Sequence, residues 1–297
     1  MIGSHDVSVV MPVGSVEPEL QEQLAALAEQ SFNGSWELVI SLNTADPVDR
    51  VALDAALDLF RVDAVNGPPV NVVDSSSVRS ASHARNVGAQ AAKAPFLAFC
   101  DSDDIADPHW LENIVDALGA GGAVGGYLEE ERLAVTGQEN WRPPATPGGN
   151  PTFLGHPYLV SANMGVDAEA FRLVGGFDES LIRGEDIAFA WSLIRSDVAL
   201  GYASGAVMHY RHRKGLWPML KQHYLYGRGM SQILSRQGVP DTSAGNSALL
   251  RANGQRVEQM NAVHVLRRGS IALGRLLGLA IEAVPNNSDR TSTSGRK

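Results

Sequence analysis

The sequence predicts an α/β protein with a mostly parallel central sheet flanked by helices and a helical C-terminal extension. Two observations indicate this class. Short apolar runs of strand length alternate with amphipathic stretches of helix length over residues 7–118, which is the β-α-β order of a parallel sheet. In addition, residues 7–13 (VSVVMPV) form an apolar run, as expected for a strand buried on both faces. Ligands of such sheets bind beyond the carboxyl ends of the strands.

The next elements are predicted from the same two periodicities. Apolar residues recur at helical spacing in four stretches, which predict helices over residues 19–32, 48–62, 82–93 and 108–118. Short β-prone runs between them predict strands over residues 36–41, 70–74 and 95–100. Pro108 suits the first turn of the fourth helix, where its missing N–H has no helical partner to lose.

Residues 137–157 interrupt this alternation. Five prolines lie in this stretch, so we expect a long loop, which is either a functional lid or a plain linker. Beyond the loop, the pattern predicts helices over residues 168–174 and 186–195, strands over 198–203 and 206–210, and helix after residue 215 with a polar break at 238–246.

The last apolar stretch covers residues 271–284 and contains Arg275 and Glu282. It is too short to span a bilayer. We interpret it as a core helix, and the alternative is an amphipathic helix that lies at a membrane interface.

Composition limits the class of protein. The chain has 297 residues, of which 44% are hydrophobic and 19% charged, as is typical of a folded globular protein. Its single cysteine, Cys100, excludes an internal disulfide framework and a multi-cysteine metal site. The first residues do not have the pattern of a signal peptide, and we expect a reducing compartment such as the cytoplasm.

The net charge of −9 conceals an uneven distribution. Residues 1–204 contain 10 Lys and Arg against 29 Asp and Glu, whereas residues 205–297 contain 14 against 4. A basic C-terminal third is typical of a surface that faces phosphate or anionic lipid, which predicts a peripheral contact with the inner face of a cell membrane. The alternative is a set of solvated helix faces.

Three carboxylates lie directly after the predicted strand 95–100. Asp101, Asp103 and Asp104, with Ser102 between the first two, repel one another unless a cation relieves the repulsion. Carboxylate oxygens suit Mg²⁺ or Mn²⁺, so the cluster predicts a metal site. The alternative is a turn in which aspartates cap the next helix.

Further groups suited to chemistry follow other elements. Glu185 and Asp186 begin a predicted helix, where one carboxylate can be a general base and where capping is the alternative role. Arg85 begins another helix and can hold a pyrophosphate through two hydrogen bonds, or is a surface residue. His209 leads a basic run and can ligate a metal, or is structural.

Five segments occur in an order and spacing that are specific when taken together: VSVVMPV, SASHARNVGAQAA, FLAFCDSDD, NMGVDAEAFRLVGGFDE and GEDIAFAWSLIR. With them, residues 7–213 resemble the family 2 inverting glycosyltransferases, which have a GT-A fold. The resemblance implies a nucleotide-diphosphate sugar donor, a divalent metal such as Mn²⁺ or Mg²⁺, and inversion at the anomeric carbon.

The resemblance also implies roles for single residues. Asp101 and Asp103 fall on the family's D-x-D positions, so Asp103 would bind the metal and Asp101 would contact the ribose or the metal. Asp186, next to Glu185, falls on the E-D motif and would be the catalytic base, and His209 would complete the metal site. The sugar and acceptor pocket would comprise Asn163, Met164, Gly165, Gly176 and Phe177, together with Trp217.

Two turns depart from the family pattern. The first strand ends in residues 12–15 (PVGS) instead of a P-x-Y-N-like turn, and the second ends in residues 41–44 (SLNT) instead of D-D-G-S. Because these turns normally cradle the nucleobase and ribose, the sequence does not identify the base. The predicted donor-binding set is Pro12, Val13, Asn43, Arg85, Asp101, Ser102 and Asp103.

The expected reaction is hexosyl transfer to a glycan, a lipid-linked acceptor or a small molecule in cell-envelope or polysaccharide synthesis, without a nucleic-acid partner. The predicted parts are a nucleotide-sugar-binding half (residues 1–118), an acceptor and catalytic half (119–214), a helical extension (215–285) and a disordered tail (286–297).

Other classes fit the sequence less well. A nucleotidyltransferase commonly has a Gly-rich, basic loop after its first strand, but residues 13–20 (VGSVEPEL) contain one Gly and no Lys or Arg. A haloacid-dehalogenase-type phosphatase has Thr or Val where this chain has Ile105, and its motif comes earlier in the chain. A non-catalytic module that binds a sugar nucleotide or carbohydrate needs no base, and it is the alternative that we retain.

Overall fold

The computed structural model describes residues 5–64, 67–119, 121–136, 138, 148–240 and 262–282. The chain forms two compact units. The main unit comprises Met1–Ser180, Glu185–Arg213 and Val239–Glu258, and the C-terminal unit comprises Leu181–Gly184, Lys214–Gly238 and Gln259–Lys297. The predicted tail 286–297 lies outside the described residues, as do residues 137 and 139–147 of the predicted loop and 241–246 of the predicted polar break.

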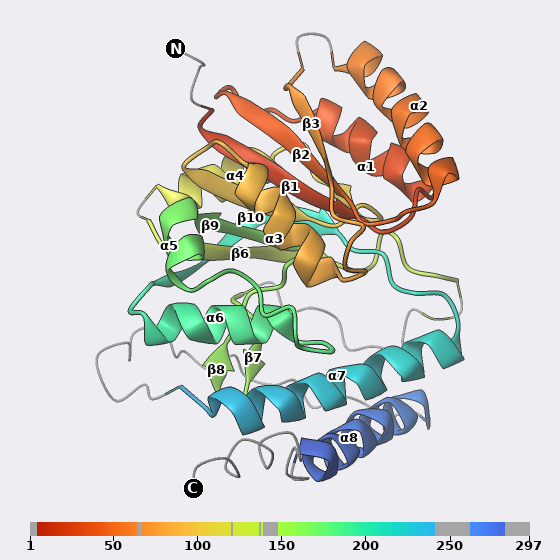
Figure 1. Cartoon of the computed structure of the whole chain (residues 1–297), viewed down its shortest axis with the longest axis vertical. Helices are drawn as coiled ribbons and strands as arrows, with labels where there is room; N and C mark the ends of the chain where they lie inside the picture. The colour runs from red at the N-terminus through yellow and green to blue at the C-terminus, as the bar shows by residue number, and fades with distance from the viewer. Residues whose placement is uncertain are drawn as a thin grey trace, which may run out of the picture. The chain divides into compact units, whose positions relative to one another are not determined.

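An eight-stranded sheet forms the centre of the main unit (Figure 1). In spatial order its strands are β3 (Val70–Asp74), β2 (Trp36–Leu42), β1 (Val7–Val13), β4 (Phe96–Cys100), β9 (Asn163–Asp167), β6 (Ala123–Glu129), β10 (Leu200–His209) and β5 (Ile105–Ala106). The first four are parallel, β9 runs antiparallel between β4 and β6, and β6 and β10 are parallel. The predicted α/β class with a mostly parallel sheet is confirmed.

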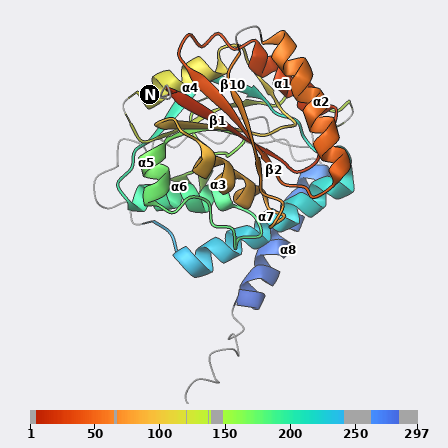
Figure 2. The ribbon, with the colours of Figure 1, turned by 45° about the horizontal axis from the view of Figure 1, so that its top comes forward.

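Helices cover both faces of the sheet because its central strands are apolar on both sides. In β1, Val7, Val9 and Met11 lie in one core cluster, with residues of α1, α2 and α4. Val10 points the other way and lies in a second cluster, with residues of α3, α5 and α6. Figures 1 and 2 show α3 on the opposite face from α1 and α2. These helices are α1 (Glu19–Ala28), α2 (Pro47–Asp63), α3 (Ala81–Ala91), α4 (Trp110–Leu118), α5 (Ala168–Leu173) and α6 (Glu185–Arg195).

Three strands of the sheet were not expected from the sequence: β5, β6 and β9. Glycines weaken the strand pattern of β6 and β9, yet packing requires them. A Cβ atom at Gly126 would collide with the side chain of Asn163, and one at Gly165 would lie 2.6 Å from Cγ2 of Ile114. The predicted loop 137–157 also contains a short hairpin of β7 (Thr152–Phe153) and β8 (His156–Pro157).

Two predicted boundaries differ from the structure. The strands expected over 198–203 and 206–210 are one strand, β10, whose register with β6 shifts between Ala203 and Val207. The apolar pattern of the sequence is interrupted at the same point, which is why two separate strands were expected. Helix α1 ends at Ala28, before residue 32, and the side chain of Gln30 donates a hydrogen bond to the carbonyl of Ala26 at 3.0 Å. That bond satisfies a carbonyl in the last turn.

The C-terminal unit contains α7 (Leu216–Gln237) and α8 (Ala262–Glu282), which pack against each other. Glycines allow the two backbones to approach closely. A Cβ atom at Gly227 would collide with the carbonyl of Ile271, and one at Gly274 with the carbonyl of Tyr224. This unit confirms the predicted helical extension. Among the described helices, none is both long enough and apolar enough to cross a membrane.

Candidate active site

The carboxyl end of β4 presents an acidic cluster. Asp101, Asp103 and Asp104 each place a carboxylate oxygen within 4.8 Å of the others, and they are the group of described residues that could hold a metal ion. The turn brings them together because β5 begins directly afterwards, at Ile105, and pairs with the end of β10. The predicted proximity of these three side chains is therefore present.

Repulsion and burial perturb the acids of this cluster. Burial, and then the charge of Asp101, raise the pKa of Asp103 to about 6. Burial, and then the charges of Asp101 and Asp103, raise the pKa of Asp104 well above its usual range. Asp104 is fully buried, and its Oδ2 has no hydrogen-bond partner among the described residues. An unsatisfied buried carboxylate oxygen beside two other acids fits a hard divalent cation.

Arg211 fastens this turn to the segment after β10. Its backbone N–H donates to Oδ1 of Asp104 at 2.7 Å, and its Nε donates to the carbonyl of Asp103 at 2.8 Å. Its guanidinium also pairs with Glu22 at 2.6 Å. Arg211, in the basic run after β10, therefore helps to hold the acidic turn in place, a role that the sequence pattern did not predict.

Arg85 connects the acidic cluster to the start of α6. From the first turns of α3, its guanidinium contacts Asp101 at 2.5 Å and Glu185 at 3.3 Å. The residue is 4% exposed, and its guanidinium lies 5.9 Å from the ring centroid of Phe177. Burial opposes the charge, but the carboxylates of Asp101 and Glu185 outweigh it and raise the pKa of Arg85. Three motifs far apart in sequence therefore meet at one cation.

Asp186 lies next to this ion pair and is the most perturbed acid at the start of α6. Burial, and then the charge of Glu185, raise the pKa of Asp186 to about 7. The N–H of Ile187 donates to its Oδ1 at 2.8 Å, and this bond and the charge of Arg85 act in the opposite direction. A carboxylate with a pKa near neutrality can take up and release a proton at working pH, which is the property of a general base.

His209 lies at the end of β10, where it pairs with Ile105, the residue that follows the acidic turn. Its Nδ1 lies 2.7 Å from Oε2 of Glu129 at the end of β6. Burial opposes ionisation of Glu129, but hydrogen bonds from His209 and from the N–H groups of Glu131 and Arg132 lower its pKa overall. Nε2 of His209 is buried without a partner among the described residues. A carboxylate on one ring nitrogen and a vacant second nitrogen are typical of a histidine that ligates a metal.

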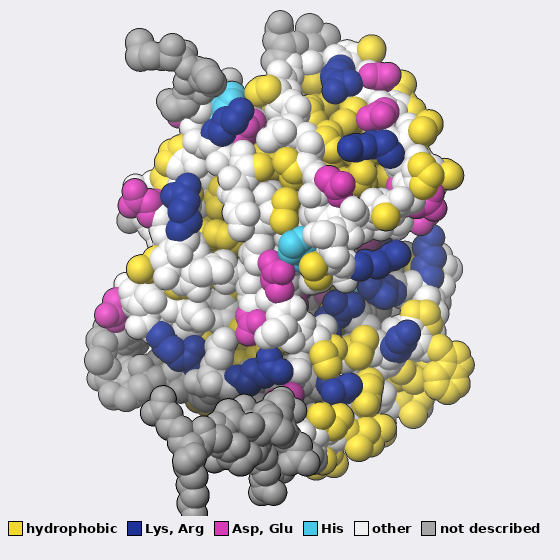
Figure 3. Space-filling model, viewed as in Figure 1, with side chains coloured by type: hydrophobic (Ala, Val, Ile, Leu, Met, Phe, Trp, Pro, Cys, Tyr) yellow, Lys and Arg dark blue, Asp and Glu magenta, His cyan; other side chains and the backbone are white. Residues whose placement is uncertain are grey.

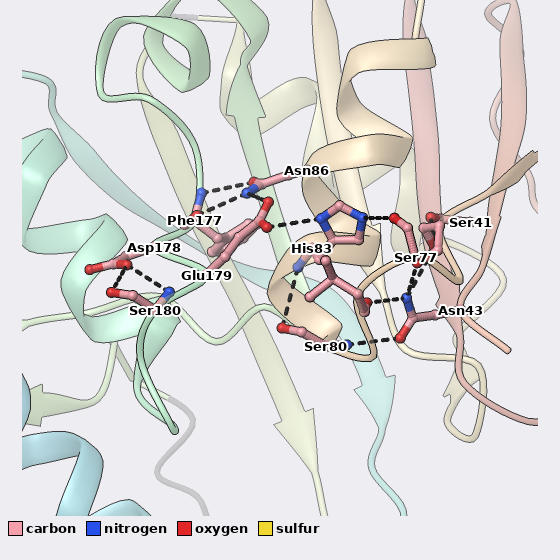
Figure 4. Close-up of polar contacts among 12 residues, drawn as sticks. Ser41, Asn43, Ser77, Ser80, His83, Asn86, Phe177, Asp178, Glu179 and Ser180 are labelled. Atoms are coloured by element: carbon pink, nitrogen blue, oxygen red, sulfur yellow. Dashed lines mark hydrogen bonds and ion pairs between the residues drawn. The ribbon is translucent and has the colours of Figure 1, made fainter.

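The predicted nucleotide side of the site centres on Asn43, which is buried. Its Nδ2 donates to the carbonyls of Ser75 and Val78, and its Oδ1 accepts from the N–H of Ser80 at 3.0 Å. The side chain thus orders the turn between β3 and α3 (Figure 4). Pro12 and Val13 are buried at the end of β1 beside it, where the carbonyl of Val13 accepts from the N–H of Asn43. Direct contact of these residues with a nucleobase stays a prediction.

A second network joins α3 to the segment after α5. Nδ1 of His83 lies 2.8 Å from Oε2 of Glu179, and Nδ2 of Asn86 donates to Oε1 of Glu179 at 2.8 Å (Figure 4). Asn86 also accepts from the N–H of Phe177 at 2.9 Å. Because Arg85 lies between His83 and Asn86 on α3, these bonds fix the helix that positions it. No pattern in the sequence predicts these three polar contacts.

The residues expected to shape the sugar and acceptor pocket lie mostly inside the fold. Asn163 is buried, accepts from Nε1 of Trp110 and donates to the carbonyls of Tyr127 and Ala206. Met164 and Phe177 are buried core residues, and Gly165 and Gly176 lie where side chains of neighbours leave no room for a Cβ atom. Trp217 belongs to the C-terminal unit and is 79% exposed. A pocket role for these six residues stays a prediction.

The sequence is similar to that of known glycosyltransferases. The family model described as Glycosyl transferase family 2 matches residues 8–174. A pre-mycofactocin glycosyltransferase of Mycobacterium tuberculosis is 27% identical over 261 residues, which cover 81% of this chain and 50% of that protein. The O-antigen biosynthesis protein RfbC of Myxococcus xanthus is 27% identical over 78% of this chain and 18% of its own length. The chain thus spans half or less of the length of these two relatives.

Solved structures share the fold at low sequence identity. The mannosyltransferase PcManGT from Pyrobaculum calidifontis, in complex with GDP-Man and Mn²⁺, has a TM-score of 0.61 at 15% identity and covers 95% of this chain and 74% of its own. S. aureus TarS 1-349 in complex with UDP-GlcNAc has a TM-score of 0.53 at 15% identity and covers 78% and 73%. At such identity the likeness concerns the fold, which is the expected GT-A type.

Proposed function

Because the chain belongs to glycosyl transferase family 2, we propose that it transfers a hexosyl group from a nucleotide-diphosphate sugar to an acceptor hydroxyl, with inversion at the anomeric carbon. The observation that supports this most directly is the bridge formed by Arg85. It joins Asp101 of the acidic cluster to Glu185, the neighbour of Asp186. In this proposal, the donor site and the base are linked through one buried cation.

The metal-binding part of the proposal assigns Asp103 and Asp101 as ligands of Mn²⁺ or Mg²⁺, with His209 as a further ligand. The unpartnered Oδ2 of Asp104 and Nε2 of His209 support it, because both atoms can bind a cation. A divalent ion here would supply positive charge to the diphosphate of the donor. Arg85 holds Asp101, and Arg211 holds the backbone of the turn. Mn²⁺ in the complex of PcManGT is consistent with this assignment.

The catalytic part assigns Asp186 as the base. Its carboxylate accepts the proton of the acceptor hydroxyl while the acceptor oxygen bonds to the anomeric carbon from the face opposite the leaving group. The bond between the anomeric carbon and the phosphate oxygen breaks, and its electron pair leaves with the nucleoside diphosphate. The pKa of about 7 supports this role, since such a base is ionised in a large fraction of molecules at neutral pH and still accepts a proton. Glu185 supports the site through Arg85.

The proposal also assigns donor binding and acceptor binding to different parts of the chain. We assign residues 1–118 to donor binding, with Pro12, Val13, Asn43 and Ser102 on the nucleoside side, and residues 119–214 to acceptor binding and catalysis. A glycan or lipid-linked acceptor in polysaccharide synthesis is supported by the name of the O-antigen relative. Nucleotide sugars appear in the complexes of both structural neighbours, as GDP-Man and UDP-GlcNAc.

A donor panel tests the proposal. The melting temperature is measured with UDP-, GDP- and dTDP-sugars, each with Mn²⁺ and with EDTA, because a ligand that binds the native state raises it. We expect one nucleotide class to raise it in a metal-dependent manner, and the same donor to release nucleoside diphosphate slowly in the presence of acceptor hydroxyls. A shift without any turnover across glycan and lipid-linked acceptors would favour the retained alternative, a non-catalytic binding module.

A further inference from the structure

The outward side of α8 is apolar. Gly274 and Gly278 are buried against α7, and Glu282 accepts a hydrogen bond from Gln232 of α7, so these residues mark the inward side. Elsewhere on α8, seven apolar residues are 43–67% exposed: Val265, Leu266, Leu273, Leu276, Leu277, Leu279 and Ile281. With about 100° between successive residues, Leu273 and Leu276 lie opposite the inward side. A helix whose outward side faces water has charged residues on that side, whereas the outward positions around Leu273 and Leu276 carry no charged residue.

Positive charge accompanies this apolar surface. The Lys and Arg residues of the two helices are Lys221, Arg228 and Arg236 on α7 and Arg267, Arg268 and Arg275 on α8. Their acidic residue is Glu282, whose Oε2 lies 3.6 Å from Nε of Arg236. Figure 3 shows hydrophobic side chains together with Lys and Arg where Figure 1 draws α7 and α8. The arginines of α8 lie toward its inward side and flank the apolar face.

We propose that α8 docks on an anionic membrane surface, with its apolar face between headgroups and acyl chains and the basic residues of the two helices at the lipid phosphates. An apolar stripe flanked by Arg is the pattern of a helix that lies in the interface, and each basic residue adds attraction to anionic lipid. A second copy of the chain fits less well, because two such faces would bring arginines together with one acidic residue from each copy. The proposal goes beyond the transfer reaction and does not depend on it.

Vesicle co-sedimentation of the full chain tests the docking. The probes are vesicles of phosphatidylcholine with phosphatidylglycerol, and of phosphatidylcholine alone, without donor or metal. We expect binding to the anionic vesicles that weakens as NaCl increases. The double variant Leu273→Glu/Leu276→Glu should lower the partition coefficient at least about tenfold, since both side chains would leave the acyl boundary. The matched control, Val51→Glu/Leu59→Glu on exposed positions of α2, adds the same charge and should keep wild-type binding.

Three results would overturn the docking. One is no binding of the wild type to anionic vesicles at low salt. Another is an equal loss in the α2 control, which would assign the effect to net charge alone. The third is a wild-type dimer in light scattering that the α8 variant converts to a monomer, which would assign the face to a second copy. If circular dichroism shows that the Glu variant loses helix, Leu273→Ala/Leu276→Ala replaces it, because Ala preserves the helix and removes the apolar area.

Discussion

At the scale of single residues, the candidate site contains carboxylates whose surroundings raise the free energy of the ionised form. The pKa values of Asp103 and Asp186 are raised to about 6 and about 7, and the pKa of Asp104 is also raised. In each case burial is the largest cause and a neighbouring acid is the next. A carboxylate with a raised pKa is stabilised when a cation binds it or when it takes up a proton. The charges of Arg85, near Asp186, and of Arg211, near Asp103 and Asp104, partly offset these shifts.

The pH dependence of the rate tests the assignment of Asp186. The base acts only when ionised, and its pKa is about 7, so kcat/KM should fall as pH decreases below about 7, approaching a tenfold loss per pH unit, and should level off above about 8. The measurement is kcat/KM from pH 5 to 9 with saturating metal. An inflection near the ordinary pKa of an aspartate, or a flat profile, would contradict this assignment.

Replacing Asp186 with Asn separates catalysis from binding. The variant Asp186→Asn keeps the size of the side chain and an acceptor for the N–H of Ile187, but it cannot take a proton. We expect kcat to fall about 10²- to 10⁴-fold while the donor still raises the melting temperature as in the wild type. Asp116→Asn, an exposed position of α4, is the control and should retain full activity. Near-wild-type turnover of Asp186→Asn would refute the role as base.

At the scale of secondary-structure elements, Asn163 holds together the middle of the sheet. It accepts from Trp110 of α4 and donates to the carbonyls of Tyr127 in β6 and Ala206 in β10, at 2.9 Å each. The variant Asn163→Ala would remove all three hydrogen bonds, of which those with Trp110 and Ala206 are buried. We expect the free energy of unfolding to fall by about 3 kcal/mol or more, measured by denaturant titration.

The control for this experiment is Asn113→Ala on α4. Asn113 donates one side-chain hydrogen bond to the carbonyl of His109, the N-cap residue of α4. Losing this bond should change the free energy of unfolding by less than about 1 kcal/mol. If Asn163→Ala were as stable as this control but had a raised KM for the acceptor, a pocket role for Asn163 would be favoured over a structural one.

The first half of the fold could be predicted because its signals are local. Strands β1 to β4 and helices α1 to α4 show the apolar alternation that their own burial imposes, and each lies within a few residues of its expected range. In β6 and β9, by contrast, Gly126 and Gly165 are required by side chains from elsewhere in the fold. No local pattern records such a contact, and both strands were missed.

The candidate site also has one part that the sequence predicts and one part that it does not. The grouping of Asp101, Asp103 and Asp104 could be predicted because adjacent residues after a strand must end at one edge of the sheet. The bridge from Arg85 to Asp101 and Glu185 joins three segments of the chain, and spacing alone does not contain it. The resemblance to a family located these residues, and the structure shows that Arg85 is in direct contact with two of them.

At the scale of the whole molecule, the acidic charge of the main part of the chain opposes the binding of a negatively charged donor. Residues 1–204 contain 29 Asp and Glu against 10 Lys and Arg, and the proposed donor brings a diphosphate to this acidic part of the chain. Either a cation bound at the acidic cluster resolves the conflict, or general screening by salt is enough. The two explanations differ in range, because a bound ion acts at contact distance whereas screening acts over about 10 Å at ordinary ionic strength.

Metal removal at two salt concentrations separates these explanations. With Mn²⁺, the preferred donor should raise the melting temperature, and EDTA should abolish this rise at low NaCl. Raising NaCl in EDTA should not restore it, because Na⁺ has half the charge and the three carboxylates within 4.8 Å suit a divalent ion. Asp103→Asn should reproduce the effect of EDTA in the presence of Mn²⁺. Recovery of the donor shift by NaCl alone would assign donor binding to long-range electrostatics and leave the acidic cluster without a metal role.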